Sequence, residues 1–429
     1  MLIVVSRLMI KILKSSNIIG RFFASIALIL PIIGFLAPKG ITLLAIFASL
    51  AGFVIFKIQN RNINFLGRPF IILFFLIALW ALISSFWAPN VISASIGSIK
   101  LLANLLVGAT FFSLLNSVDL IERKLILRSL ALGFFIILGL IIIEVLFENP
   151  INVFLKNVDI NHLKTEGIFL IGAFWLHSPT VILSLIIWVL CCYSLDKDLI
   201  KAGSQKFTYS IIAGFLLILI TASLIGYITS IMATLIGLIG WLGVLVLRKK
   251  ALLVLGAVLT ISALSLPFLI NEAEDFEGQV TKNIPHKTSA VHRIKIWEFT
   301  AKKISERPFL GWGMNASKHI SDGKNIVYSA SGGYLGEALP LHPHNAILQI
   351  WVELGLPGIL IFLLLGYYFF RVIYQAAKPD AVKAIIVGQF LTFFIFASLS
   401  FGLWQAWWLC LSWFAVSFMK LAVTSDSFD

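Results

Sequence analysis

Two histidines stand directly before a polar helix face in the last third of the chain. His342 and His344 are followed by Asn345, Gln349 and Glu353, which are spaced four residues apart. These three polar residues would share one side of a helix that begins near Asn345. An imidazole beside such a face could act as a general base or could bind an anion. The pattern predicts chemistry at the start of this helix, with the three polar residues in supporting roles.

Pro357 predicts a kink in the same helix. Its ring lacks an amide hydrogen and clashes with the carbonyl of Glu353, four residues earlier. The Glu353 carboxylate beside that carbonyl could be a base or could stabilise the kinked backbone. A continuous helix from Asn345 to Tyr374 would be roughly 45 Å long, whereas a membrane's hydrocarbon core is ~30 Å thick. The first part of the helix is therefore expected at or above the outer interface.

The composition is that of a polytopic membrane protein. Hydrophobic residues make up 59% of the chain and charged residues 12%, whereas soluble proteins are about one quarter charged. The net charge of +13 is explained by basic residues in loops, so no nucleic-acid partner is expected. The three cysteines lie in apolar segments, which argues against a disulfide framework.

An all-α fold with about twelve transmembrane helices is expected. Nine helices fall within residues 1–270 and three within 346–429, separated by a polar segment, residues 271–345. Two apolar stretches are too long for one span, so turns are expected near Ser223–Gly226 and Ser398–Gln405. The other spans are expected near 18–37, 41–57, 69–88, 93–115, 127–147, 168–193, 251–270 and 345–374.

The positions of basic residues predict the orientation of the chain. Most lysines and arginines fall in loops on one side, whereas the short loops on the other side hold only Lys39, Lys156 and Lys164. Because basic loops stay in the cytoplasm, both termini are expected there. The polar segment is then expected outside.

Within the polar segment, residues 292–304 predict an amphipathic helix that lies over the membrane helices. Arg293 lies one turn from Trp297, and Pro and Gly residues within 306–313 would end the helix. Its apolar stripe consists of Ile294, Trp297, Ala301 and Ile304.

Three ionisable residues fall within the expected spans. Lys100, Glu144 and His177 would each be costly in lipid and are therefore functional candidates. Lys100 and Glu144 could instead neutralise each other as a structural pair. A structural role is equally open for His177.

The sequence contains no nucleotide-binding glycine loop, no GxSxG elbow and no HExxH motif. Nucleotides are scarce outside the cytoplasm, so an enzyme there needs a donor already activated on a lipid. Arg293, the histidines and Lys100 suit an anionic group such as a diphosphate. His342 and His344 lack a nearby carboxylate or cysteine at metal-ligand spacing, so no metal is expected.

The chain resembles the O-antigen ligase and polymerase superfamily of bacterial envelope glycan assembly. His344 and Asn345, then nine residues, Gly355, two residues and Gly358 match the ligase signature. The run from Arg293 to Gly313 is similar to the family's periplasmic region. An arginine that family members often carry in the span at 168–193 is absent, and His177 could substitute for it.

The resemblance implies a GT-C-like membrane glycosyltransferase that needs no metal, ATP or other cofactor. It would move an undecaprenyl-diphosphate-linked glycan onto lipid A–core oligosaccharide, at the periplasmic face of the bacterial inner membrane. It implies that His344 and Arg293 are essential, with Arg293 binding the diphosphate. His342, Lys100 and His177 are candidates to assist there, and His344 could be either the base or a phosphate ligand. A polymerase that extends the lipid-linked glycan is an alternative, and a lipid or solute transporter is a more distant one.

Overall fold

The protein is an all-α polytopic membrane protein with a small additional hairpin. The computed structural model describes residues 17–157, 175–196, 205–272, 288–329 and 332–423. Twelve helices in these ranges are long and apolar enough to cross a membrane, which confirms the predicted fold class and span number. They are α2 (Ile18–Leu36), α3 (Gly40–Ile58), α4 (Arg68–Ser84), α5 (Val91–Leu115), α6 (Leu120–Leu146), α10 (His177–Tyr193), α12 (Gln205–Leu224), α13 (Ile228–Leu247), α14 (Lys249–Glu272), α17 (Ala346–Gln375), α18 (Asp380–Leu399) and α19 (Ala406–Val423).

The two predicted turns are present between helices. Residues 225–227 separate α12 from α13, and residues 400–405 separate α18 from α19. The predicted span at 168–193 is described only from residue 175, and its helix begins at His177; the earlier part lies outside the described residues.

The long helices pack around two main groups of buried side chains. The larger group surrounds α10, the most buried span, and includes residues of α2, α6, α18 and α19. The second group joins α4, the first part of α5, α16 (Thr288–Glu306) and α17. Large apolar side chains such as Leu43, Ile239 and Leu253 are exposed on the outer surface, as expected for helices that face lipid.

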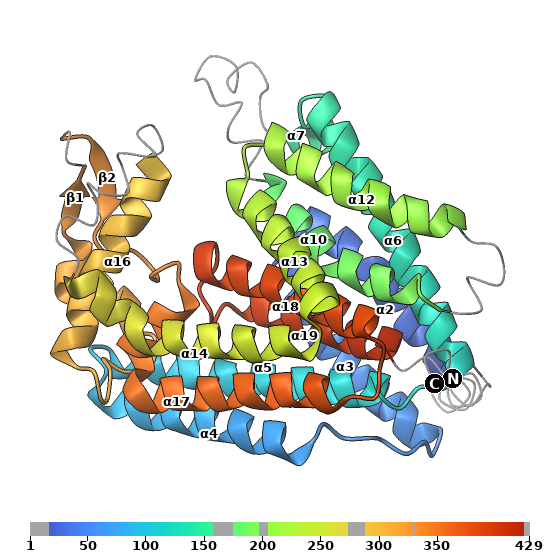
Figure 1. Cartoon of the computed structure of the whole chain (residues 1–429), viewed down its shortest axis with the longest axis horizontal. Coiled ribbons are helices and arrows are strands. Elements are labelled where there is room, and N and C mark those ends of the chain that lie inside the picture. The colour runs from blue at the N-terminus through green and yellow to red at the C-terminus, as the bar shows by residue number, and fades with distance from the viewer. Residues whose placement is uncertain (1–16, 158–174, 197–204, 273–287, 330–331, 424–429) are drawn as a thin grey trace, which may run out of the picture.

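The described part of the polar segment, from residue 288, folds against one end of these helices (Figure 1). The predicted amphipathic helix is part of α16, which buries Ile294, Ala301 and Ile304. A two-stranded antiparallel hairpin, β1 (Ile326–Tyr328) and β2 (Tyr334–Glu337), packs beside α16 and was not predicted. Short elements complete the described fold: α7 (Pro150–Lys156), η1 (Ser85–Trp87), η2 (Ala316–Lys318) and η3 (Ser321–Lys324).

The predicted kink in α17 is present at Gly355, where the backbone adopts φ 60° and ψ −158°. This left-handed conformation favours glycine, and a Cβ at Gly355 would also collide with the carbonyl of Phe309. The loop after α16 fills the break: Trp312 N and Gly313 N donate to the carbonyls of residues 352 and 353, each over 2.8 Å. The indole Nε1 of Trp80 donates to Leu354 O over 2.8 Å. The backbone groups released by the kink are therefore hydrogen-bonded rather than left unpaired in a membrane helix.

Candidate active site

The candidate site is organised by the turn that precedes α17. His344 has a φ of 51°, which is uncommon for a residue with a side chain and often marks a functional position. Its backbone N–H donates to His342 Nδ1 over 3.2 Å. Asn345 caps α17, because its Oδ1 accepts from Leu348 N over 3.1 Å. The turn is thus held by side chains of its own residues.

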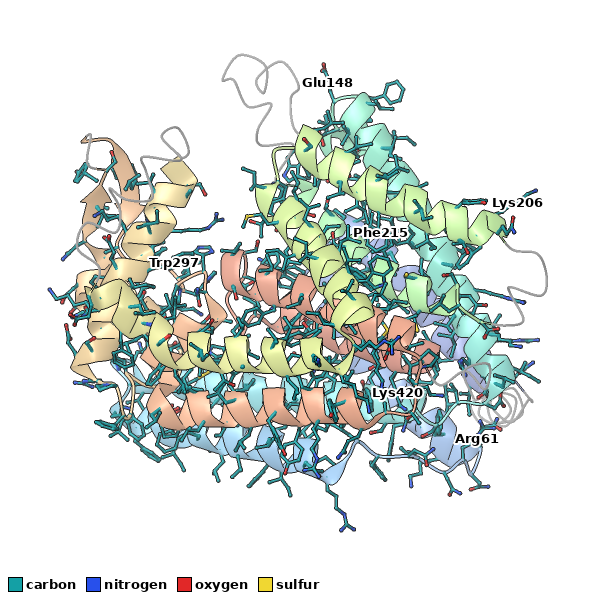
Figure 2. All side chains as sticks on the ribbon, viewed as in Figure 1. Arg61, Glu148, Lys206, Phe215, Trp297 and Lys420 are labelled. Atoms are coloured by element: carbon teal, nitrogen blue, oxygen red, sulfur yellow. The ribbon has the colours of Figure 1, made fainter. Side chains whose placement is uncertain are left out.

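Helix α16 is hydrogen-bonded to the same turn. The indole Nε1 of Trp297, on the side of α16 that faces the long helices (Figure 2), donates to Pro343 O over 3.0 Å. The predicted Trp297 stripe therefore does more than pack, since it ties the helix that carries Arg293 to the residue before His344.

The hydrogen bond of His344 determines which ring nitrogen can accept a proton. Its Nδ1 lies 3.1 Å from the backbone carbonyl oxygen of Ser400. A carbonyl oxygen only accepts, so Nδ1 carries the hydrogen and Nε2 of the neutral ring has the free lone pair. Burial, followed by the nearby charge of Arg293, lowers the pKa of His344 to about 4. The ring is therefore neutral at pH 7, with Nε2 available as a base.

His342 is oriented in the opposite sense. Because its Nδ1 accepts the His344 amide hydrogen, the neutral His342 ring carries its hydrogen on Nε2. The two rings lie 4.1 Å apart between centroids. Burial and then the neighbouring His344 lower the pKa of His342 to about 3. The pair therefore combines one neutral acceptor and one neutral donor.

Arg293 supplies positive charge to this group. Its partly buried guanidinium interacts electrostatically with Tyr227 and His344. Burial lowers the pKa of Arg293 from its ordinary value, but a guanidinium remains protonated in proteins. Within the part of the chain that the structure describes, no carboxylate and no hydrogen-bond acceptor is paired with it. This cation could therefore bind an anion.

Two residues that sequence reasoning missed, Tyr227 and Ser400, complete the group. The Tyr227 hydroxyl lies 3.0 Å from Ser400 Oγ, and the His177 ring stacks on Tyr227 at 4.0 Å and 9°. Burial raises the pKa of Tyr227 to about 12, so its hydroxyl stays protonated. The structure thus brings His342, His344, Arg293 and His177 together around a tyrosine and a serine, which lie in the turns between α12 and α13 and between α18 and α19.

The predicted polar face of α17 is present and buried. Glu353 Oε1 accepts from Ser317 Oγ over 2.6 Å, and Oε2 accepts from Asn315 N over 2.9 Å and from Trp404 Nε1 over 2.8 Å. Gln349 Nε2 donates to Glu353 Oε1 over 3.3 Å, while its Oε1 accepts from Leu403 N over 2.8 Å. These bonds favour the structural role for Glu353, because they join α17 to the turn at 315–317 and to the turn at 400–405.

Lys100 stands apart from this arrangement. Its side chain is exposed on α5, and among the described residues no hydrogen bond or ion pair connects it to the histidines. The alternative of a Lys100–Glu144 pair is wrong. The Glu144 carboxylate instead accepts from Ile151 N over 2.6 Å and from the side chain of Asn152, at the start of α7. A role for Lys100 in donor binding stays a prediction.

Comparison with known proteins places the candidate site in a recognisable region. Residues 207–363, which include Tyr227, Arg293 and His344, match the family model described as O-Antigen ligase. These residues form an O-antigen ligase-type region. The resemblance seen in the sequence is thus confirmed for this part of the chain.

Curated relatives of this chain are named putative polysaccharide ligases. Those of Rickettsia conorii and Rickettsia prowazekii are each 39% identical over 145 residues, which is 34% of this chain and 35% of the relative. That of Rickettsia bellii is 38% identical over 152 residues, 35% of this chain and 36% of the relative. The match spans about a third of the length of these relatives. No solved structure matches the chain.

A sequence signal for the two missed residues, Tyr227 and Ser400, existed but was incomplete. Tyr227 follows the predicted turn at Ser223–Gly226, and Ser400 lies within the predicted turn at Ser398–Gln405. Both turns were expected on the same side as the polar segment, so their side chains could have been counted as candidates. Nothing in the spacing could pair two residues that lie so far apart in the chain.

Proposed function

We propose that the protein is a membrane glycosyltransferase that moves an undecaprenyl-diphosphate-linked glycan onto lipid A–core oligosaccharide. The observation that carries the proposal is His344, whose Nδ1 is held by the Ser400 carbonyl beside the Arg293 cation. The ligase-type region and the polysaccharide ligase names of the relatives support a glycan substrate. Placement in the bacterial inner membrane, with both termini cytoplasmic and the site facing the periplasm, belongs to the same proposal.

In the proposed reaction, a hydroxyl of the acceptor sugar attacks the anomeric carbon of the donor. The hydroxyl proton passes to Nε2 of His344 as the new C–O bond forms. The bond from the anomeric carbon to the diphosphate breaks, and the polyprenyl diphosphate leaves with the electron pair. Arg293 stabilises the charge that develops on this leaving group. No nucleotide or metal is needed to balance the step.

The donor's own charge would tune the base. The pKa of His344 is about 4 with the site empty, which is low for a base at neutral pH. A diphosphate beside the ring favours the protonated imidazole and raises that pKa towards neutrality. His344 would therefore become an effective base only after the donor binds.

Neutral groups around Arg293 would complete donor binding. His342 can donate from Nε2, because its Nδ1 already accepts from the His344 amide. His177 would contribute through its stack on Tyr227. We keep Lys100 as a further predicted donor-binding residue that a direct variant must test, since its exposed side chain lies on a different helix.

An apolar cavity below the site would hold the polyprenyl chain of the donor. The cavity has a volume of about 370 Å³ and lies among residues of α4, α5, α17, α18 and α19. Leu403 and Trp404 line it, and both belong to the turn that also contains Ser400. A lipid tail in this cavity would therefore extend from the turn that orients His344.

Reconstitution with purified components tests the proposal. The protein should join an undecaprenyl-diphosphate glycan to lipid A–core in the presence of a chelator and without nucleotide. The His344→Ala protein, inserted to the same level, should be inactive. Products that grow only on the carrier lipid, with the core untouched, would move the assignment to a polymerase, and movement of the lipid without bond formation would indicate a transporter.

A further inference from the structure

A second cavity lies between α14 and α17, at the end of α17 remote from His344. Figure 1 shows these two helices side by side, and residues of both line a cavity of about 470 Å³. Gly256 and Gly366 belong to this lining. A Cβ built on Gly256 has Phe370 as its nearest neighbour, at 3.9 Å, so the space beside this glycine is open. The apolar part of the lining consists mainly of leucine and aromatic side chains.

The rim of the cavity at the C-terminal end of α17 carries basic and polar side chains. Arg371, Tyr374 and Gln375 line it, and Lys249 Nζ lies 4.9 Å from the centre of the Tyr374 ring. Arg371 is exposed, and within the described ranges no carboxylate or hydrogen-bond acceptor is paired with it. The acidic Asp380 is engaged by Arg248, at 3.6 Å. The rim therefore has positive charge to offer an anion.

The length of the cavity matches one leaflet of a bilayer. On α17 the lining runs from Leu363 to Gln375, which corresponds to roughly 18 Å of helix. Half of a ~30 Å hydrocarbon core is about 15 Å. An acyl chain that fills the apolar part would thus place its head group at the level of Arg371 and Lys249.

We propose that this cavity binds one anionic phospholipid from the leaflet at the basic ends of α14 and α17. The phosphate would lie between Arg371 and Lys249, and an acyl chain would pass over Gly256 and Gly366. The site is independent of glycosyl transfer. A bound lipid would stabilise α14 and α17 without entering the reaction; α17 begins two residues after His344, and α14 packs against α16, which carries Arg293.

Lipid-dependent thermal unfolding of the full-length purified protein tests this proposal. Phosphatidylglycerol added to the detergent solution should raise the unfolding midpoint, whereas phosphatidylethanolamine should not. Arg371→Gln and Lys249→Gln should each weaken the apparent affinity for phosphatidylglycerol about fivefold, the contribution expected of one basic residue at a membrane surface. Gly256→Leu should abolish the response by filling the space for the chain.

Lys57→Gln provides a matched control, because Lys57 also lies over an aromatic ring at a helix end, 5.4 Å from the centre of Phe53, outside the cavity. An equal loss of response in this variant would show a general effect of surface charge and overturn the proposal. So would an unchanged response in Gly256→Leu. Native mass spectrometry of protein extracted from membranes should show a retained phospholipid that Arg371→Gln reduces, and a retained polyprenyl phosphate in its place would also overturn it.

Discussion

Replacement of Glu353 tests whether its carboxylate has a structural or a catalytic role. Its two oxygens accept from Ser317, Asn315, Trp404 and Gln349. In Glu353→Ala all four donors lose their acceptor, and each buried unpaired group costs about 1–3 kcal/mol. Even with partial relaxation, the loss in unfolding free energy should be on the order of 4 kcal/mol.

Glu353→Gln should be much milder, for a reason visible in the geometry. The amide oxygen can take the position of Oε2 and keep the bonds from Asn315 N and Trp404 Nε1. The amide nitrogen then faces Ser317 Oγ, and a hydroxyl can accept as well as donate. Only the long bond from Gln349 is lost, so the cost should be about 1–2 kcal/mol. Because the hydrogen-bond frame survives, transfer activity should stay within several-fold of the unmodified protein.

The assay compares unfolding midpoints and transfer rates of the two variants with those of Glu337→Gln. Glu337 forms an exposed ion pair with Lys324 at 2.8 Å, a kind of contact worth about 0–1 kcal/mol. Loss of transfer in Glu353→Gln with little change in stability would refute the structural role and make Glu353 part of the chemistry. If Glu353→Ala unfolds at the same midpoint as Glu337→Gln, the expected cost of leaving four buried donors without an acceptor is refuted.

Four further outcomes are expected. His344→Ala and Arg293→Ala should each reduce transfer at unchanged protein abundance, His344→Ala by about 10²–10⁴-fold. Arg293→Lys should restore little activity, because an ammonium cannot bind phosphate in a bidentate manner. Near-normal transfer rates in these variants would exclude the proposed roles. Tyr227→Phe should slow transfer by up to about tenfold through the lost Ser400 bond, and rates equal to the unmodified protein would remove it from the site. Without substrate, the free energy of unfolding should fall as the pH drops from about 6.5 towards 4. The reason is that the pKa of His344 is depressed in the folded protein, so the unfolded chain binds more protons in this range. A free energy of unfolding that does not change with pH, or that changes equally in His344→Gln, would contradict this. Reporter proteins that work only outside the cytoplasm should be active when fused at Gly278 or Gly323. If only reporters that work in the cytoplasm are active at these positions, the topology is the reverse of the predicted one.

Much of α17 and its surroundings could be predicted because local rules govern them. The four-residue spacing of Asn345, Gln349 and Glu353 defined a face that is indeed buried and internally bonded. Pro357 predicted a kink, and the structure has it two residues earlier, at Gly355. The sequence could not show that the break would be filled by residues 308–313, because that contact depends on how two distant segments approach each other.

Residues outside regular patterns were harder to interpret. Tyr227 and Ser400 are single turn residues whose pairing exists only in the folded chain. Lys100 was singled out because a charge within a span is costly, yet its side chain is exposed on α5 rather than turned into the bundle. The β1–β2 hairpin escaped prediction because strands of three and four residues carry too little alternation to be recognised.

The hydrogen bond between His344 and Ser400 has a consequence for how the site could be controlled. Arg293 lies on α16, and His344 lies in the turn before α17, whereas Ser400 lies in the turn after α18 and His177 begins α10. The tautomer of the imidazole is therefore set by a backbone carbonyl of the turn between α18 and α19. A displacement of the turn at 400–405 from α17 by one or two ångströms would break the bond between Nδ1 and Ser400, together with the bonds from Leu403 N to Gln349 and from Trp404 Nε1 to Glu353. Under the proposed function, an opening that admits the acceptor would release the base from its fixed tautomer, and closure of the turn onto α17 would restore it.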